Sequence, residues 1–263
     1  MVPFRQVGLL LRDEQQAYPL PEVRGLLERQ GIRTVLLEGD AVPPRELDLV
    51  MALGGDGTVL HALERFPQCP VLAINFGMVG FLTAGDRKDL EGLVGLLIEG
   101  RYLVSERLAL DCQTPHGTTR AINEVILRTS NRLSFTDVFV NGTKIRTIRG
   151  DGVVVGTPTG STAFLMSTGA PIVMPDVRCL ILDGINEYNL TSRALILPPE
   201  SRVRLLVNPE TREASVRLTV DGRILGELAP GQEVHICQSS QPARLLYFEP
   251  NYFFHNLSSK LSW

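Results

Sequence analysis

The chain has 263 residues, of which 44% are hydrophobic and 21% charged, values typical of a globular protein with one large domain or two of ordinary size. Its formal net charge of −3 predicts no basic surface for nucleic acid. No apolar stretch approaches the roughly 20 residues of a membrane span, so we expect no membrane partner and a cytoplasmic location. The four cysteines are widely scattered and are expected to be free thiols in a reducing compartment.

The first hundred residues alternate between strand and helix patterns. The segment at 47–55, LDLVMALGG, is apolar on both faces, as a buried parallel strand is. This alternation predicts a doubly wound α/β domain over residues 1–104. Strands are expected at 5–12, 33–39, 47–55 and 69–77, and helices at 21–31, 58–66 and 86–100.

From about residue 105 the pattern changes to short alternating runs separated by N-G, D-G and P-P turns. Such runs are typical of antiparallel strands. We therefore predict a second, antiparallel β domain over residues 105–245, interrupted by one helix at about 161–170. The last twenty residues, with their clustered aromatics, are of mixed character.

Residues 54–58 read GGDGT and lie between a predicted buried strand and a helix. Ligands of open α/β sheets bind beyond the carboxyl ends of the strands, and free N–H groups at a helix start attract phosphate. The loop is not a dinucleotide fingerprint, because Leu60 occupies the third glycine position, and no lysine follows to make a phosphate-binding P-loop. A carboxylate would repel a phosphate, so Asp56 needs another purpose in this loop. It can accept a proton from a hydroxyl that attacks a phosphoryl group, or it can help to hold Mg²⁺. A plain D-G turn is the alternative.

Residues 149–164, RGDGVVVGTPTGSTAF, form a second strand–loop–helix pattern. Its small hydroxyl residues and glycine at the predicted helix start would make a nest of N–H and O–H donors. The alternative is an ordinary Ser/Thr helix cap. Two such donor nests in one chain favour a nucleotide ligand.

Asn123 and Glu124 open the otherwise apolar strand AINEVILRT. A buried amide and carboxylate need polar partners, which ribose hydroxyls and an adenine edge would supply. The alternatives are an exposed strand end and a strand-pairing salt bridge. Asp151 and Asp221 lie in D-G turns typical of hairpins.

Two weaker candidates remain. Arg149 lies beside Asp151 in the sequence, where a surface ion pair is the simple interpretation. His61 faces either the core or a site.

Taken together, these motifs resemble those of NAD kinases. GGDGT, the N-E pair, GDGVVVGTPTGSTAF and the closing FFHNLSSKLSW occur in the family's order and approximate spacing, and INFGMVGFLT at 74–83 is similar to its N-x-G-x-x-GFL segment. The resemblance covers essentially the whole chain. GGDGT alone is shared with diacylglycerol, sphingosine and phosphofructo-kinases, whereas GGDGT followed by N-E and TPTGSTA is much more specific.

The resemblance implies phosphoryl transfer from ATP, or inorganic polyphosphate, to the adenosine-ribose 2′-hydroxyl of NAD, giving NADP. It also implies Mg²⁺ or another divalent cation and a homodimer or homotetramer. The expected fold is an N-terminal α/β domain and a C-terminal β domain, with the tail 246–263 returning to the first domain.

The site residues implied by the resemblance fall into two groups. Asp56 matches the aspartate assigned as base for the ribose hydroxyl. The other implied residues contact phosphates, adenosine or the rest of the dinucleotide. Two of them, Arg149 and Asp151, reach the ligand within one subunit or across a subunit boundary. The full set is Gly55, Gly57, Thr58, His61, Phe81, Asn123, Glu124, Arg149, Asp151, Thr159, Thr162, Ala163, Phe164, Ser167 and Asn186.

The chain departs from the family pattern at three places. Phe164 stands where tyrosine is common, and Thr168-Gly169-Ala170 replaces Ser/Ala-Gly-Gly. The usual P-x-x-P-H stretch is replaced within 183–198, DGINEYNLTSRALILP, which puts nicotinamide-side contacts and the choice between NAD and NADH in question. The alternative functions are a lipid or sphingoid-base kinase sharing GGDGT and a non-catalytic dinucleotide-binding regulator.

Overall fold

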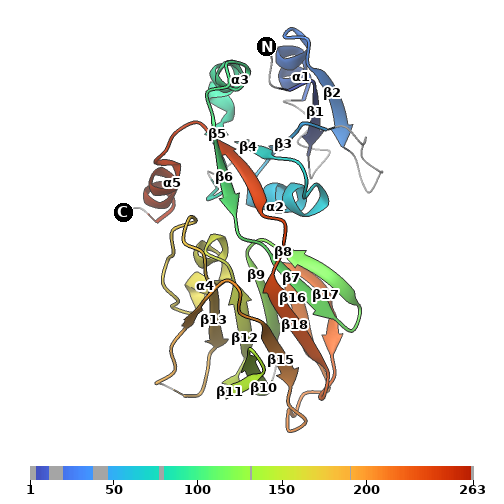
Figure 1. The fold of residues 1–263 in the computed structure, drawn as a ribbon, viewed down its shortest axis with the longest axis vertical. Helices are drawn as coiled ribbons and strands as arrows, with labels where there is room; N and C mark the ends of the chain where they lie inside the picture. Colours follow the sequence, from blue (N-terminus) through green and yellow to red (C-terminus); the bar gives the residue numbers. More distant parts are fainter. Residues whose placement is uncertain are drawn as a thin grey trace. The chain divides into compact units, whose positions relative to one another are not determined.

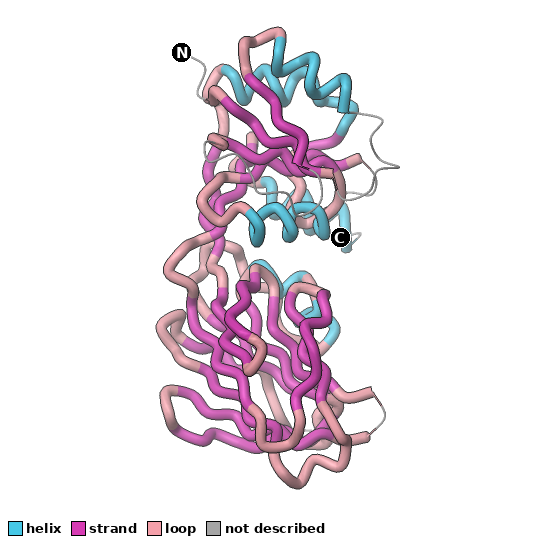
Figure 2. The backbone as a smooth tube through the Cα atoms, turned by 90° about the vertical axis from the view of Figure 1, so that its right-hand side faces the viewer, coloured by secondary structure: helices cyan, strands magenta, loops and turns pink. Residues whose placement is uncertain are grey.

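The computed structural model describes residues 4–11, 20–37, 47–76, 80–130, 132–189 and 191–261. The chain forms two compact units, Met1–Glu106 together with Ala243–Trp263, and Arg107–Pro242. The sequence pattern placed the corresponding changes after residues 104 and 245. Helices gather in the first unit and strands dominate the second (Figure 2).

The first unit is built on a parallel sheet, which confirms the predicted α/β fold. The strand order is β2-β1-β3-β4-β19-β6, and β5 pairs with β4. β1 pairs in parallel with β2 and β3, and β4 in parallel with β3, β5 and β19, so the end of the chain returns to this sheet as predicted. The strands are β1 (Gln6–Leu10), β2 (Arg33–Leu37), β3 (Leu49–Leu53), β4 (Val71–Asn75), β5 (Gly85–Asp86), β6 (Leu103–Arg107) and β19 (Ala243–Tyr247).

Helices cover both faces of this sheet (Figure 1). The apolar residues of α1 and α3 pack with Leu9, Met51 and Ile74 on one face. α2 contacts β3 and β4 on the other, and β3 is buried at every position, as predicted. None of the helices in the described ranges is long and apolar enough to cross a membrane. The helices are α1 (Leu20–Glu28), α2 (Asp56–Arg65), the 3₁₀ turn η2 (Arg87–Asp89), α3 (Leu90–Ile98) and α5 (Tyr252–Leu261).

In the first unit, the start of α2 differs from the prediction, and three predicted strand ends fall outside the described residues. α2 begins at Asp56 rather than at Thr58, because Gly55 takes the N-cap position in extended conformation. Asp56 is therefore the first helical residue and not a turn residue. The predicted strand ends at 12, 38–39 and 77 lie outside the described residues.

The second unit contains two antiparallel sheets, β11-β10-β15-β18-β7-β8 and β14-β13-β12-β9-β16-β17. Their inward-facing residues, such as Val138 and Leu205 from one and Leu127 and Val155 from the other, form one core. This confirms the predicted antiparallel β fold. The strands are β7 (Leu110–Thr114), β8 (Gly117–Ala121), β9 (Glu124–Arg128), β10 (Ser134–Val140), β11 (Thr143–Gly150), β12 (Gly152–Gly156), β13 (Leu180–Ile185), β14 (Leu195–Leu197), β15 (Val203–Val207), β16 (Val216–Val220), β17 (Arg223–Leu228) and β18 (Glu233–Gln238).

The prediction of a single helix over 161–170 is wrong. A 3₁₀ turn, η3 (Thr159–Thr162), and the four-residue α4 (Phe164–Ser167) take its place. Ala163 separates them with a non-helical ψ of −127°. The preceding loop is tied to the start of β9, since Thr157 N donates to Asn123 O at 2.9 Å, so the chain cannot enter a regular helix directly.

The two D-G turns differ from each other. Asp221 and Gly222 have φ of 45° and 77° and join the paired strands β16 and β17, as predicted for a hairpin. The hairpin prediction for Asp151 is wrong, because β11 before it and β12 after it belong to different sheets.

Candidate active site

The Asp56 carboxylate lies just past the end of β3 and is held by a neighbouring loop. Phe81 N donates to its Oδ2 at 2.9 Å and Leu82 N to its Oδ1 at 3.0 Å. Gly80 lets this loop approach, because a Cβ there would lie 2.0 Å from Asp56 Oδ1. Each carboxylate oxygen thus accepts one backbone N–H and keeps further lone-pair capacity.

The start of α2 presents backbone donors beside this carboxylate. The first N–H groups of a helix have no intrahelical acceptor, and Gly55 has no side chain to cap them. Gly55 is exposed, with no atom within 4 Å of the place of a Cβ, so an anion can approach. Thr58 is buried and its N–H donates to Gly55 O at 2.9 Å. His61 and Phe81 are half-buried in this unit.

In the second unit, the Asn123–Glu124 segment is held from both sides. The Asp221 carboxylate accepts the N–H groups of Ile122 at 2.7 Å, Asn123 at 2.8 Å and Glu124 at 3.1 Å. From the opposite side, Thr157 donates its hydroxyl to Ile122 O at 2.6 Å. Only the hairpin role of Asp221 was predictable, since nothing local in the sequence links this residue to a segment nearly a hundred residues earlier.

The Glu124 side chain is 5% exposed, so the alternative of an exposed strand end is wrong. Burial, and secondly the Asp221 charge, raise the pKa of Glu124 to about 8, although a hydrogen bond from the Phe164 N–H acts in the other direction. Its Oε2 has no partner among the described residues, which also excludes the salt-bridge alternative there. A buried protonated carboxyl with one unsatisfied oxygen is suited to a polar ligand group.

Two pockets of the second unit gather five of the predicted residues. One, of about 490 Å³, is lined by Glu124, Asp151 and Phe164. The other, of about 600 Å³, is lined by Phe164, Ser167 and Asn186. Arg128 lines both, and its guanidinium lies 5.9 Å from the centre of the Phe164 ring.

Most hydroxyl groups of the 157–168 loop donate to carbonyls within the loop and its surroundings, so they do not form the predicted nest of free donors. Thr162 Oγ1 donates to Thr159 O at 3.2 Å, and Ser167 Oγ donates to Phe164 O at 2.7 Å. Thr159 Oγ1 accepts a hydrogen bond from the buried Arg107 at 3.2 Å. These bonds hold the loop that carries Ala163 in place. The Arg107 cation that donates to this loop was not predicted from the sequence.

Arg149 does not pair with Asp151, so the surface ion-pair interpretation is wrong. Its guanidinium lies over the Phe135 ring, 5.6 Å from the centroid. Asp151 instead accepts a hydrogen bond from Asn186 Nδ2 at 2.7 Å, which explains how Asn186 joins the same region.

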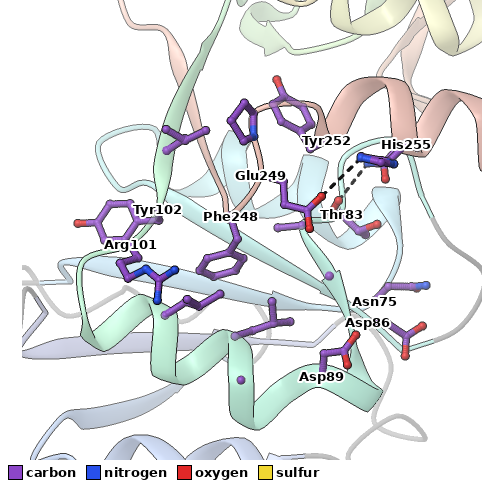
Figure 3. Close-up of a pocket in the computed structure, with 18 of the residues that line it drawn as sticks. Asn75, Thr83, Asp86, Asp89, Arg101, Tyr102, Phe248, Glu249, Tyr252 and His255 are labelled. Carbon is purple, nitrogen blue, oxygen red and sulfur yellow. Dashed lines mark hydrogen bonds and ion pairs between the residues drawn. The ribbon is translucent and has the colours of Figure 1, made fainter.

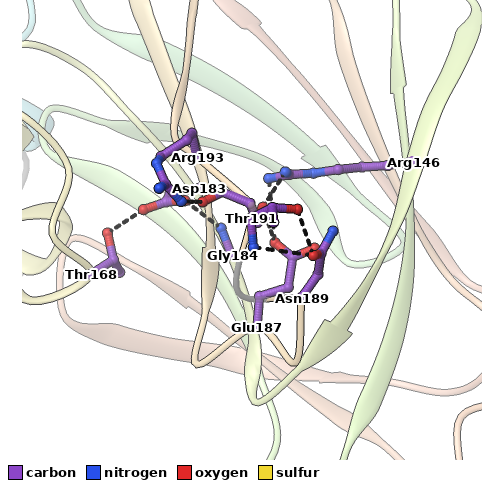
Figure 4. Close-up of polar contacts among 9 residues, drawn as sticks. Arg146, Thr168, Asp183, Gly184, Glu187, Asn189, Thr191 and Arg193 are labelled. Carbon is purple, nitrogen blue, oxygen red and sulfur yellow. Dashed lines mark hydrogen bonds and ion pairs between the residues drawn. The ribbon is translucent and has the colours of Figure 1, made fainter.

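Residues of the divergent 183–198 segment join Arg146 and Thr168 in a polar network (Figure 4). Glu187 is nearly buried and pairs with Arg146 at 3.5 Å. Thr168, at one of the departures from the family pattern, donates to Asp183 at 2.7 Å. Tyr188, by contrast, is 81% exposed.

Comparison with known proteins shows the family to which this chain belongs. Models of the ATP-NAD kinase N-terminal and C-terminal domains match residues 13–102 and 122–248. The chain belongs to the ATP-NAD kinase family. An NAD kinase of Clostridium perfringens is 31% identical over 98% of this chain and 99% of its own length. The family identifies the chain as an enzyme that phosphorylates NAD to NADP, as the sequence predicts, and disfavours the lipid-kinase alternative.

Solved structures agree with this assignment. Yeast NADH kinase complexed with NADH superposes with a TM-score of 0.89 at 25% identity, over 99% of this chain and 88% of that one. An NAD kinase from Archaeoglobus fulgidus in complex with ATP has the same fold, with a TM-score of 0.79 at 24% identity over 97% and 99% of the two chains.

Proposed function

We propose that this chain transfers the γ-phosphoryl group of ATP to the 2′-hydroxyl of the adenosine ribose of NAD, with Asp56 accepting the hydroxyl proton. The observation that carries the proposal is the position of the Asp56 carboxylate. It lies at the carboxyl end of β3, beside free helix N–H groups, and is oriented by two backbone donors. A base held in this way can take a proton from a hydroxyl that attacks a phosphoryl group.

The dinucleotide would be recognised by the second unit. Glu124, protonated near neutral pH, would donate to a ribose oxygen or an adenine nitrogen through its unpaired carboxyl oxygen. Asn123 would add an amide to the same region, and the Phe164 ring would stack on the adenine. Thr162, Ala163 and Ser167 would line the adenosine pocket, with Asp151 and Asn186 farther along the ligand.

The expected divalent cation would be held mainly by the phosphates of the donor. No cluster of three or more His, Cys, Asp or Glu side chains is found among the described residues, so they offer no metal cage. Mg²⁺ is commonly bound by substrate phosphates with only one or two carboxylates, and this chemistry fits a single aspartate beside a phosphate loop. The ion would supply charge neutralisation on the phosphates.

The test is a turnover assay with NAD, Mg²⁺ and ATP that detects NADP with an NADP-specific dehydrogenase. Asp56→Asn should lower kcat by at least about 100-fold, the scale of general-base catalysis, while the Kd for NAD changes little. Asp48→Asn is the matched control, because the Asp48 carboxylate also accepts two backbone N–H groups, from Arg5 and Gln6, but at the opposite end of β3. Near-normal turnover by Asp56→Asn would remove Asp56 from this role.

The same assay resolves the substrates. ATP or polyphosphate is supplied as donor, and NAD or NADH as acceptor, in all four combinations. NADH deserves equal weight as acceptor, since the yeast relative is an NADH kinase. Binding of NAD without turnover in any combination would favour the regulator alternative.

We also propose a homodimer or homotetramer in which Arg149 contacts the ligand of a neighbouring subunit, while Asp151 contacts the ligand of its own. The exposed Tyr188 and Ile196 lie in the segment after Asp151's partner Asn186 and are suited to a subunit contact. Light scattering would give the mass. Mixing inactive Asp56→Asn and Arg149→Ala subunits should restore part of the turnover if sites are shared, and restore none if each subunit is self-sufficient.

A further inference from the structure

The C-terminal segment of the chain binds the reverse side of the loop that holds Asp56. Asn256, on α5, donates its two amide hydrogens to Phe81 O and Thr83 O, each at 3.1 Å. Tyr247, at the end of β19, donates its hydroxyl to Leu82 O at 3.2 Å. Three consecutive carbonyls of the loop are therefore fixed by two side chains from the C-terminal segment.

One peptide plane connects Asn256 directly to Asp56. The carbonyl of Phe81 accepts from Asn256, and the N–H of Leu82, in the same planar peptide group, donates to Asp56 Oδ1 at 3.0 Å. Fixing the carbonyl at one end of a rigid plane fixes the direction of the N–H at the other. The carbonyl-side bond also polarises the N–H and strengthens the bond to the carboxylate.

Packing holds both donor side chains, Tyr247 and Asn256, in place. Tyr247 is fully buried and its ring stacks on that of Tyr252 at 3.4 Å between centroids and 8° between planes. Phe253 and Leu257 bury the inner face of α5. Tyr252 and Thr83 line a common pocket (Figure 3), so α5 lies beside this loop.

We propose that Asn256 is a positioning residue for phosphoryl transfer, acting through the Phe81–Leu82 peptide to orient the Asp56 carboxylate. The proposal rests on the proposed function of Asp56 as base. It gives the C-terminal FFHNLSSKLSW motif a role in phosphoryl transfer beyond the packing of α5. Misplacing a reacting group by about 1 Å can lower a rate by about 100-fold, so the consequence should be visible in kcat.

The experiment compares Asn256→Leu, which keeps the branching at Cγ but has no donor, with Ser259→Ala on the exposed face of α5. Asn256→Leu should lower kcat by about 10- to 100-fold with little change in KM for NAD or ATP. Ser259→Ala should match the wild type. In the Asp56→Asn background, Asn256→Leu should cause no further loss of kcat, because its effect passes through the carboxylate.

A second measurement does not depend on turnover. Amide hydrogen exchange at residues 81 and 82 should become faster in Asn256→Leu, because the loop loses the bonds that orient its N–H groups. If Asn256→Leu fails to fold, Tyr247→Phe keeps the ring stack and removes only the hydroxyl donor, and it should also lower kcat and speed this exchange.

The outcomes separate the two proposals. If Asp56→Asn retains turnover, the proposed function fails, whatever the exchange shows. If Asp56→Asn is inactive but Asn256→Leu keeps both wild-type kcat and wild-type exchange at 81–82, the positioning role alone is overturned. An additional loss of kcat in the double variant would equally overturn it, since Asn256 would then act independently of Asp56.

Discussion

Glu124 should make the protein less stable as the pH rises, and its replacement by glutamine should remove that dependence. The carboxyl is 5% exposed, and its pKa in the folded protein is about 8 against an ordinary value of 4.5. Between these two values the folded protein keeps a proton that the unfolded chain has lost. The stabilising contribution is therefore fully present below pH 4.5 and is lost progressively as the pH rises to about 8.

The magnitude follows from the width of that pH window. Each pH unit within it lowers the free energy of unfolding by about 1.4 kcal/mol, so the whole window amounts to roughly 5 kcal/mol. That is a large share of the 5–15 kcal/mol or so by which proteins are usually stable. Glu124→Gln keeps the size of the side chain and abolishes its titration, so the variant should gain stability relative to the wild type as the pH rises.

The assay is urea unfolding of both proteins at pH 5, 7 and 9, followed by far-ultraviolet circular dichroism. The difference in unfolding free energy between Glu124→Gln and the wild type isolates this one group, because every other titration is common to both. Glu200→Gln, at an exposed position of the same unit, is the control for replacing a glutamate by glutamine outside the buried site. A Glu124→Gln difference that is flat from pH 5 to 9 would refute the reasoning.

Three further predictions concern neighbouring positions. Asp221→Asn turns an amide toward the N–H groups of residues 122–124, so isothermal titration should show NAD binding weakened by about tenfold. The same change removes a charge that raises the pKa of Glu124, so the upper limit of the pH window in the unfolding assay should fall. Gly80→Ala places a Cβ on the Asp56 carboxylate and should lower kcat at least as much as Asn256→Leu in the same turnover assay. Gly92→Ala, in α3 with no atom within 4 Å of the place of a Cβ, should raise the urea-unfolding free energy by up to about 1 kcal/mol.

The fold of the first unit could be predicted because its causes are local. β3 is buried on both faces and reads as an unbroken apolar run, and α3 repeats its buried residues at helical spacing. The same local rules failed at residues 161–170. There the apolar pattern suits a helix, but Gly160 is pressed against Asn123, where a Cβ would lie 2.2 Å from the carbonyl oxygen. That contact comes from the bend just before β9, far away in the sequence, so the local pattern does not reveal it.

The residues of the candidate site also divide into those that the local sequence predicts and those that it does not. Asp56 and Glu124 stand out in the sequence because a carboxylate in a glycine loop and one in an apolar strand each contradict their surroundings. Asp221 and Asn256 do not stand out, since an aspartate in a hairpin turn and an asparagine on a half-exposed helix face are ordinary. Their importance comes from partners 97–99 and 173–175 residues away, which only the folded chain brings together.

The hydrogen-bond arrangement also explains why Asp56, rather than the better-bonded Asp221, is the candidate base. A carboxylate has about four lone-pair positions. Asp221 commits its two oxygens to three backbone N–H groups of the segment that carries Glu124, so it serves to hold that segment. Asp56 accepts one N–H on each oxygen, which orients the group and leaves a position on each oxygen for a substrate hydroxyl. Asp48 accepts two N–H groups as well, but on one oxygen and at the end of β3 away from the glycine loop. Orientation, remaining acceptor capacity and nearness to free helix N–H groups therefore coincide at Asp56 among these three aspartates.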